Sequence, residues 1–173
     1  MLKNRNRFAT ERKIMNLEMK EEEKVELVDI NEKLVSVLGL VELSAVKFDP
    51  RYVVRAFKEH TVIRRSVTAN DLLNLITRVY PEGYSTVAGL RAALLPFNKE
   101  VSMDVDVESA PVDESSLPEI DVFIHLLVQI FLHDSGELKA LHQFNEVCIN
   151  VLQSYNRRTL DFIQAKVWYY IFR

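Results

Sequence analysis

Few side chains in this sequence have the chemistry of a catalytic or metal-binding group, and their spacing argues against both roles. His125 and His133 lie eight residues apart in one predicted helix, with His142 further along the chain. Eight helical residues cover about 12 Å, whereas two histidines on one helix that share a metal ion lie three or four residues apart. We therefore expect core or boundary histidines with a ring nitrogen bonded to a carbonyl group. No metal ion or other cofactor is expected.

The single cysteine, Cys148, falls on the apolar stripe of its own predicted helix. A catalytic thiol needs an electropositive and partly open environment, so we interpret Cys148 as a small buried hydrophobic residue. One cysteine also excludes an internal disulfide and every cysteine-rich zinc pattern, which suits a reducing cytosolic or nuclear compartment. No nucleophile has a recognisable base nearby in the sequence, and we expect no enzymatic activity.

Composition and charge narrow the remaining classes of protein. The 173 residues carry a formal net charge of −3, which argues against nucleic acid as the main partner. The longest apolar run, 122–132, is too short to span a membrane, so no membrane partner is expected. With 4 glycines and 5 prolines, the chain lacks the residues that tight hairpins and phosphate-binding loops require. These features predict an all-α protein.

The elements that must position these side chains are amphipathic helices. Apolar residues recur every three or four positions over 19–41, and the Asp49-Pro50 pair has the form of a helix start. Thr68 and Asp71 have the spacing of a capping box at the front of a third helix, and a shorter helix is expected over 85–96.

The second half of the sequence is predicted to contain a central, fully buried helix. Ser116 and Glu119 have the spacing of another capping box, and nine of the eleven residues over 122–132 are apolar. Ser135 is expected to cap the next helix, whose apolar stripe includes Leu138. The last helix has a core-facing stripe formed by Leu160, Ile163, Val167 and Tyr170.

These signals divide the chain into four segments. We expect a disordered basic tail over 1–18, N-terminal helices over 19–97, and an acidic loop over 98–118 that is the most mobile internal segment. Helical hairpins over 119–173 are expected to continue the same array. Helices joined two by two describe a bundle or an irregular α-solenoid, because no residue pattern repeats at a fixed period.

The end of the last predicted helix is rich in aromatic residues. They occupy every side of the final turns, and one preceding helix can cover only one side. We therefore expect an unfinished interface, through which the chain self-associates or binds chaperones. The arginine pair that precedes this helix is included because arginine is enriched at interfaces. The candidate interface residues are Trp168, Tyr169, Tyr170, Phe172, Arg157 and Arg158.

Three stretches of the sequence resemble one known family. DPRYVVRAFKEH (49–60), IHLLVQIFLHDSGEL (124–138) and YNRRTLDFIQAKVWYYIF (155–172) are similar to the N-terminal half of the 26S proteasome non-ATPase regulatory subunit 3 family. Members of this family are PCI subunits of the regulatory particle lid. The order and spacing of the stretches, and an acidic insertion between helical blocks, also fit. The resemblance covers about 49–173.

The resemblance implies a TPR-like α-solenoid that leads into a PCI domain, so that this sequence would be the N-terminal portion of a longer protein. It implies a non-catalytic scaffold in the cytoplasm and nucleus that supports ubiquitin-dependent protein degradation. The implied partners are other lid subunits, namely neighbouring PCI subunits and a small acidic lid protein. The alternative hypothesis for the function is a stand-alone helical adaptor outside the proteasome, and a third hypothesis is a small helical enzyme.

Overall fold

The computed structural model describes residues 30–80, 85–98 and 117–173. Every regular element in these ranges is a helix, as the composition predicts. No helix in the same ranges is both long and apolar enough to cross a lipid bilayer. The predicted basic tail at 1–18 and all but the ends of the predicted acidic loop at 98–118 lie outside the described residues.

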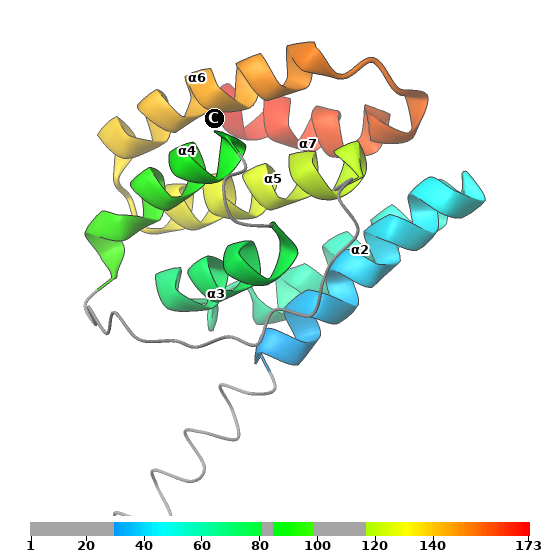
Figure 1. Cartoon of the computed structure of the whole chain (residues 1–173), viewed down its shortest axis with the longest axis horizontal. Coiled ribbons are helices and arrows are strands. Elements are labelled where there is room, and N and C mark those ends of the chain that lie inside the picture. Colours follow the sequence, from blue (N-terminus) through cyan, green and yellow to red (C-terminus); the bar gives the residue numbers. More distant parts are fainter. Residues whose placement is uncertain (1–29, 81–84, 99–116) are drawn as a thin grey trace, which may run out of the picture.

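Where the structure describes the connection between two helices, that connection is a short turn of a few residues. A first helix is described over 30–47 and continues six residues past the predicted end at Val41. The elements that follow are α2 (Pro50–Ile63), α3 (Ala69–Val79), α4 (Ser85–Leu94), the 3-10 turn η1 (Leu95–Phe97), α5 (Pro118–Asp134), α6 (Leu138–Ser154), the 3-10 turn η2 (Arg158–Leu160) and α7 (Asp161–Ile171). Figure 1 shows these helices stacked side by side, which confirms the predicted all-α solenoid.

Two of the predicted helix starts are confirmed in detail. Asp49 accepts a hydrogen bond from the backbone N–H of Arg51 at 3.0 Å, and Pro50 is the first residue of α2. Thr68 and Asp71 form a complete capping box, because each side chain accepts a hydrogen bond from the backbone N–H of the other. Both caps satisfy N–H groups that the first helical turn leaves without a partner.

Helix α5 is the centre of the core, as its sequence predicts. It packs against α3, α4, α6 and α7, and it lies in the middle of the stacked helices in Figure 1. All but one of the residues over 122–132 are buried, and the Phe123 ring stacks on Phe57 of α2 at 5.9 Å between ring centroids. The predicted stripe of α7 is also buried against this helix.

The predicted cap at Ser135 is wrong. Ser135 ends α5 instead of starting α6, and its hydroxyl donates a hydrogen bond back to the Phe131 carbonyl at 2.9 Å. The next residue, Gly136, has a φ of 75°, a conformation that glycine adopts without strain and that commonly follows the end of a helix. Helix α6 therefore begins later, and Leu138, its first residue, is exposed rather than part of the buried stripe.

Candidate interaction surface

A buried acidic group near the start of α5 ties three parts of the chain together. The Asp121 carboxylate accepts a hydrogen bond from the Tyr80 hydroxyl at 2.5 Å and from the Tyr155 hydroxyl at 3.0 Å. Tyr80 follows α3 and Tyr155 follows α6, so one carboxylate holds the ends of two other helices. Buried carboxylates are stable only when they are paired in this way.

Glu119 is a second buried acid on α5 that joins distant parts of the chain. It does not form the capping box that the sequence predicted. Helix α5 begins at Pro118 with Leu117 as its N-cap, and the Glu119 side chain is buried. Its carboxylate accepts a hydrogen bond from the Thr159 hydroxyl and lies 3.4 Å from the Arg157 guanidinium. These contacts fix η2 and hence the start of α7 against α5.

The histidines occupy structural positions. Nδ1 of buried His125 lies 2.8 Å from the Asp121 carbonyl oxygen, so Nδ1 is the protonated donor, as predicted for a core histidine. Burial lowers the pKa of His125, which favours the neutral ring. His133 instead has its Nδ1 3.4 Å from the Asp134 carboxylate, and His142 is exposed. Among the described residues, no three His, Cys, Asp or Glu side chains are grouped to hold a metal ion.

Cys148 is a core residue, as interpreted from the sequence. Its side chain is buried between α6 and the rest of the core, and burial raises the pKa of its thiol to about 12. A thiol in this environment is protonated near neutral pH and does not act as a nucleophile.

The folded chain should therefore react with a thiol-directed maleimide at pH 7 far more slowly than an exposed cysteine does. A shift of the pKa from 9.0 to about 12 alone lowers the thiolate fraction by about a thousandfold. Mass spectrometry of timed samples measures the rate. The matched control is a Cys148→Ala, Ser154→Cys variant, which places the thiol on the exposed side of the same helix. Equal rates for the two proteins would show that Cys148 is open to solvent.

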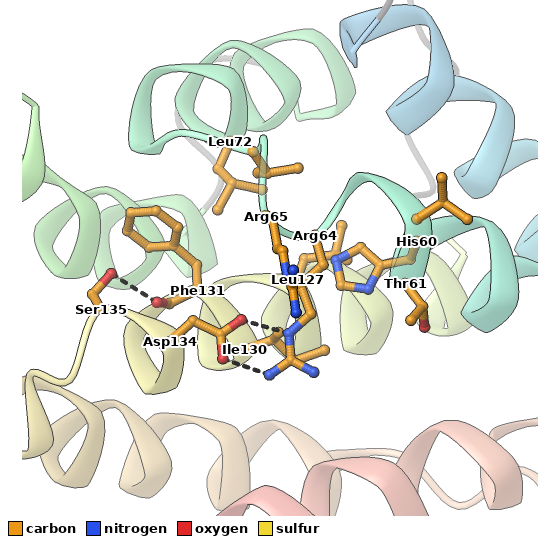
Figure 2. Close-up of a pocket in the computed structure, with 12 residues that line it drawn as sticks. His60, Thr61, Arg64, Arg65, Leu72, Leu127, Ile130, Phe131, Asp134 and Ser135 are labelled. Carbon is orange, nitrogen blue, oxygen red and sulfur yellow. Dashed lines mark hydrogen bonds and ion pairs between the residues drawn. The ribbon is translucent and has the colours of Figure 1, made fainter.

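An ion pair joins the two halves of the molecule at the ends of α2 and α5. The Arg64 guanidinium binds the Asp134 carboxylate through two hydrogen bonds of 2.5 Å each (Figure 2). The same guanidinium lies 5.6 Å from the centre of the Tyr170 ring on α7. We call Arg64, Asp134 and Tyr170 the latch. It borders a cavity of about 860 Å³ that His60 and Arg65 also line.

The outer side of α7 carries most of the predicted interface. Phe172 is 82% exposed, Tyr169 is 50% exposed and Trp168 is 38% exposed, and Trp168 stacks on Phe172 with 5.8 Å between ring centroids. Phe162, about two helical turns before Tyr169 on the same face of α7, is a further exposed aromatic residue that was not among the predicted interface residues. We call Phe162, Trp168, Tyr169 and Phe172 the α7 outer surface.

Tyr170 does not belong to that surface. Its side chain is only 2% exposed, because it lies on the buried stripe of α7 with Ile163 and Val167. The ring packs edge-on against His133 at 5.3 Å and takes part in the latch. Tyr170 is therefore a core residue, and its inclusion among the candidate interface residues is wrong for the folded chain.

Two cationic side chains lie beside Tyr169 on the α7 outer surface. The Lys166 ammonium group lies 5.0 Å from the centre of the Tyr169 ring, and the Arg173 guanidinium donates a hydrogen bond to the Tyr169 hydroxyl at 3.1 Å. A groove of about 530 Å³ between the end of α6 and α7 is lined by Arg157, Arg158 and Trp168. The structure thus brings these three predicted residues into one groove.

Comparison with known proteins shows which family the sequence of this chain matches. Residues 25–173 match the family described as PSMD3-like, N-terminal TPR repeats. The chain is similar to the 26S proteasome regulatory subunit RPN3 of Saccharomyces cerevisiae, with 31% identity over 82% of this chain and 30% of the relative. It is also similar to the probable 26S proteasome non-ATPase regulatory subunit 3 of Nicotiana tabacum, with 28% identity over 79% of this chain and 28% of that protein.

A third relative extends the match along more of the chain. The probable 26S proteasome non-ATPase regulatory subunit 3 of Anopheles gambiae is 23% identical over 91% of this chain and 33% of its own length. The chain therefore spans about a third or less of the length of these relatives.

Proposed function

Because this chain belongs to the PSMD3-like family through the N-terminal TPR repeats, we propose that it acts as a non-catalytic scaffold in the lid of the proteasome regulatory particle. In this role it supports ubiquitin-dependent protein degradation by holding other subunits in position. The cytoplasm and nucleus are the proposed compartments. Its relatives carry the name of a proteasome regulatory subunit, which supports an assembly role.

The observation that carries this proposal is the α7 outer surface. Interfaces obtain most of their binding energy from a few tryptophan, tyrosine and arginine side chains, which are the types gathered here. The opposite side of α7 is fixed by its buried stripe and by the Glu119 contacts to η2. A surface on a rigid support loses little conformational entropy when a partner binds.

The proposed partners are other lid subunits, namely neighbouring PCI subunits and a small acidic lid protein. Arg158, Lys166 and Arg173 give the rim of the α7 outer surface a positive charge. Complementary charge of this kind raises association rates and favours acidic partners. Apolar groups at the centre of the surface would supply most of the affinity.

A Trp168→Ser, Phe172→Ser double variant should recover at least tenfold less of the lid subunits in an affinity capture from cells. Burying each large aromatic side chain is worth on the order of 2 kcal/mol, and a tenfold change in affinity needs about 1.4 kcal/mol. Quantitative mass spectrometry of the captured proteins measures the loss. The matched control is a Val62→Ser, Leu138→Ser variant, which removes two exposed apolar side chains outside the α7 outer surface.

Sedimentation of the purified chain gives an independent measurement. The unmodified chain should self-associate at tens of micromolar, and the double variant should remain monomeric with an unchanged circular dichroism spectrum.

In the affinity capture, a set of captured partners that contains no proteasome subunit and is lost in the double variant would favour a stand-alone helical adaptor. Equal capture by the double variant and the control would show that another surface binds the lid.

A further inference from the structure

The sequence contains the same short pattern twice. Two arginines, one hydroxyl residue and one apolar residue follow each other at 64–67 (Arg-Arg-Ser-Val) and at 157–160 (Arg-Arg-Thr-Leu). Kinases with acidic peptide grooves bind such substrates, because guanidinium groups pair with carboxylates through directed hydrogen bonds. By sequence alone, Ser66 and Thr159 are equivalent acceptors.

In the folded chain Thr159 is not available as a phosphate acceptor. Thr159 lies within η2 and is half-buried, and its hydroxyl donates a hydrogen bond to the buried Glu119 carboxylate. Arg157 is paired with the same carboxylate at 3.4 Å. The hydroxyl that would accept the phosphate is therefore already bound to a buried carboxylate.

Ser66 differs from Thr159 in its hydroxyl group, since the first arginine of each pattern is paired, Arg64 with Asp134 and Arg157 with Glu119. Ser66 is exposed in the turn between α2 and α3, where its backbone N–H donates to the Ile63 carbonyl at 2.9 Å. Within the described part of the chain, its hydroxyl makes no hydrogen bond, and the exposed Arg65 side chain forms no ion pair. Exposed connecting turns are also the segments of a fold most accessible to other proteins.

We propose that Ser66 is a phosphorylation site for serine/threonine kinases that select basic substrates, and that the fold excludes Thr159. In the reaction the Ser66 Oγ attacks the γ-phosphorus of ATP, and the bond from that phosphorus to the β,γ-bridging oxygen breaks. ADP leaves, and the hydroxyl proton passes to the catalytic carboxylate of the kinase. The proposal does not depend on the function proposed above.

Modification of Ser66 has a defined structural consequence, because the latch begins two residues before it. A phosphoserine carries about −1.5 to −2 charges near pH 7, against one negative charge on Asp134. The phosphate therefore competes with Asp134 for the Arg64 guanidinium, whose bonds across to α5 are drawn in Figure 2. Phosphorylation opens the latch and loosens the contact of the α2–α3 turn with α5 and α7.

The site is tested with the purified chain, magnesium ATP and the catalytic domains of protein kinase A and protein kinase C. Mass spectrometry of proteolytic fragments should locate phosphate at Ser66 at a rate at least tenfold above that at Thr159. Ser66→Ala should remove this signal, and Thr159→Ala should leave it unchanged. Synthetic peptides covering 60–70 and 153–163 serve as unfolded controls and should both be labelled. No labelling of Ser66 by either kinase, or equal labelling of Thr159 in the folded chain, would overturn the proposal.

The consequence for the latch is tested by combining modification with Asp134→Asn. In the unmodified chain this substitution should lower the melting temperature by a few degrees, because the Arg64 pair is lost. In the Ser66-phosphorylated chain the same substitution should lower it by less than half as much. A full effect in both forms would show that phosphate leaves the latch closed.

Discussion

Replacing Asp121 by alanine should lower the free energy of unfolding by about 3 to 4 kcal/mol, the largest effect of a single polar substitution that we expect in this chain. The carboxylate is buried and accepts the hydroxyl groups of Tyr80 and Tyr155. Without it, two hydrogen bonds to a charged acceptor are lost, and each such bond contributes about 1.5 to 3 kcal/mol. Urea denaturation followed by far-UV circular dichroism measures the change.

Two controls separate this network from a general effect of losing a carboxylate. Asp161→Ala removes an exposed acid at the start of α7 and should change the free energy of unfolding by less than about 0.5 kcal/mol. In a Tyr80→Phe, Tyr155→Phe background, Asp121→Ala should cost about half as much, because the two hydrogen bonds are already absent. A cost for Asp121→Ala no greater than that of Asp161→Ala would mean that the network contributes nothing to stability.

Stability should also fall by on the order of 3 kcal/mol as the pH is lowered from 6.5 to 4, because of His60. Burial, assisted by the positive charge of Arg64, lowers the pKa of His60 from 6.5 to about 4 in the folded chain, although Asp134 acts in the opposite direction. Between these two values the unfolded chain binds a proton that the folded chain does not. The stabilisation is therefore complete above pH 6.5 and is lost as the pH falls toward 4. Buried His125, whose pKa is also lowered, acts in the same direction.

Urea titrations at several values between pH 7 and pH 4.5 measure this slope. A His60→Gln variant, which carries no titrating group at this position, should lose a large part of the pH dependence. His142→Gln, which changes an exposed histidine, should retain it. Identical slopes for the wild-type chain and His60→Gln would contradict a buried neutral histidine at position 60.

The features that sequence reasoning predicted correctly depend on residues close together in the chain. The capping box of Thr68 and Asp71 needs only three residues, and the burial of α5 follows from a continuous apolar run. The predicted cap at Ser135 is wrong because the Ser135 hydroxyl donates a hydrogen bond to the Phe131 carbonyl at the end of α5 and accepts none at the start of α6. Gly136 has a left-handed conformation, which is typical of the residue after a helix and places Ser135 at the end of α5. This conformation depends on how α5 ends and has no signal in the spacing of Ser135 from later residues.

The candidate site was predicted only in part for a related reason. Helical periodicity places Trp168 and Phe172 on the open side of α7, whereas Tyr170 falls on the stripe that other helices cover. Contacts that join distant residues, such as Arg64 with Asp134, leave no local pattern in the sequence. The same holds for the contacts of Glu119, whose spacing from Ser116 has the form of a cap while its carboxylate binds a hydroxyl forty residues away.

The central position of α5 also governs how the chain can fold while it is being synthesised. Helices α3 and α4 leave the ribosome before α5, yet their apolar faces pack against it. At about 5–20 residues per second, the ribosome needs on the order of seconds to add the residues between η1 and the end of α5. During that interval the nascent first half exposes a hydrophobic surface that only its own unfinished continuation can cover. Chaperone contact with the growing polypeptide is therefore most valuable in this interval, before the middle of the chain has emerged.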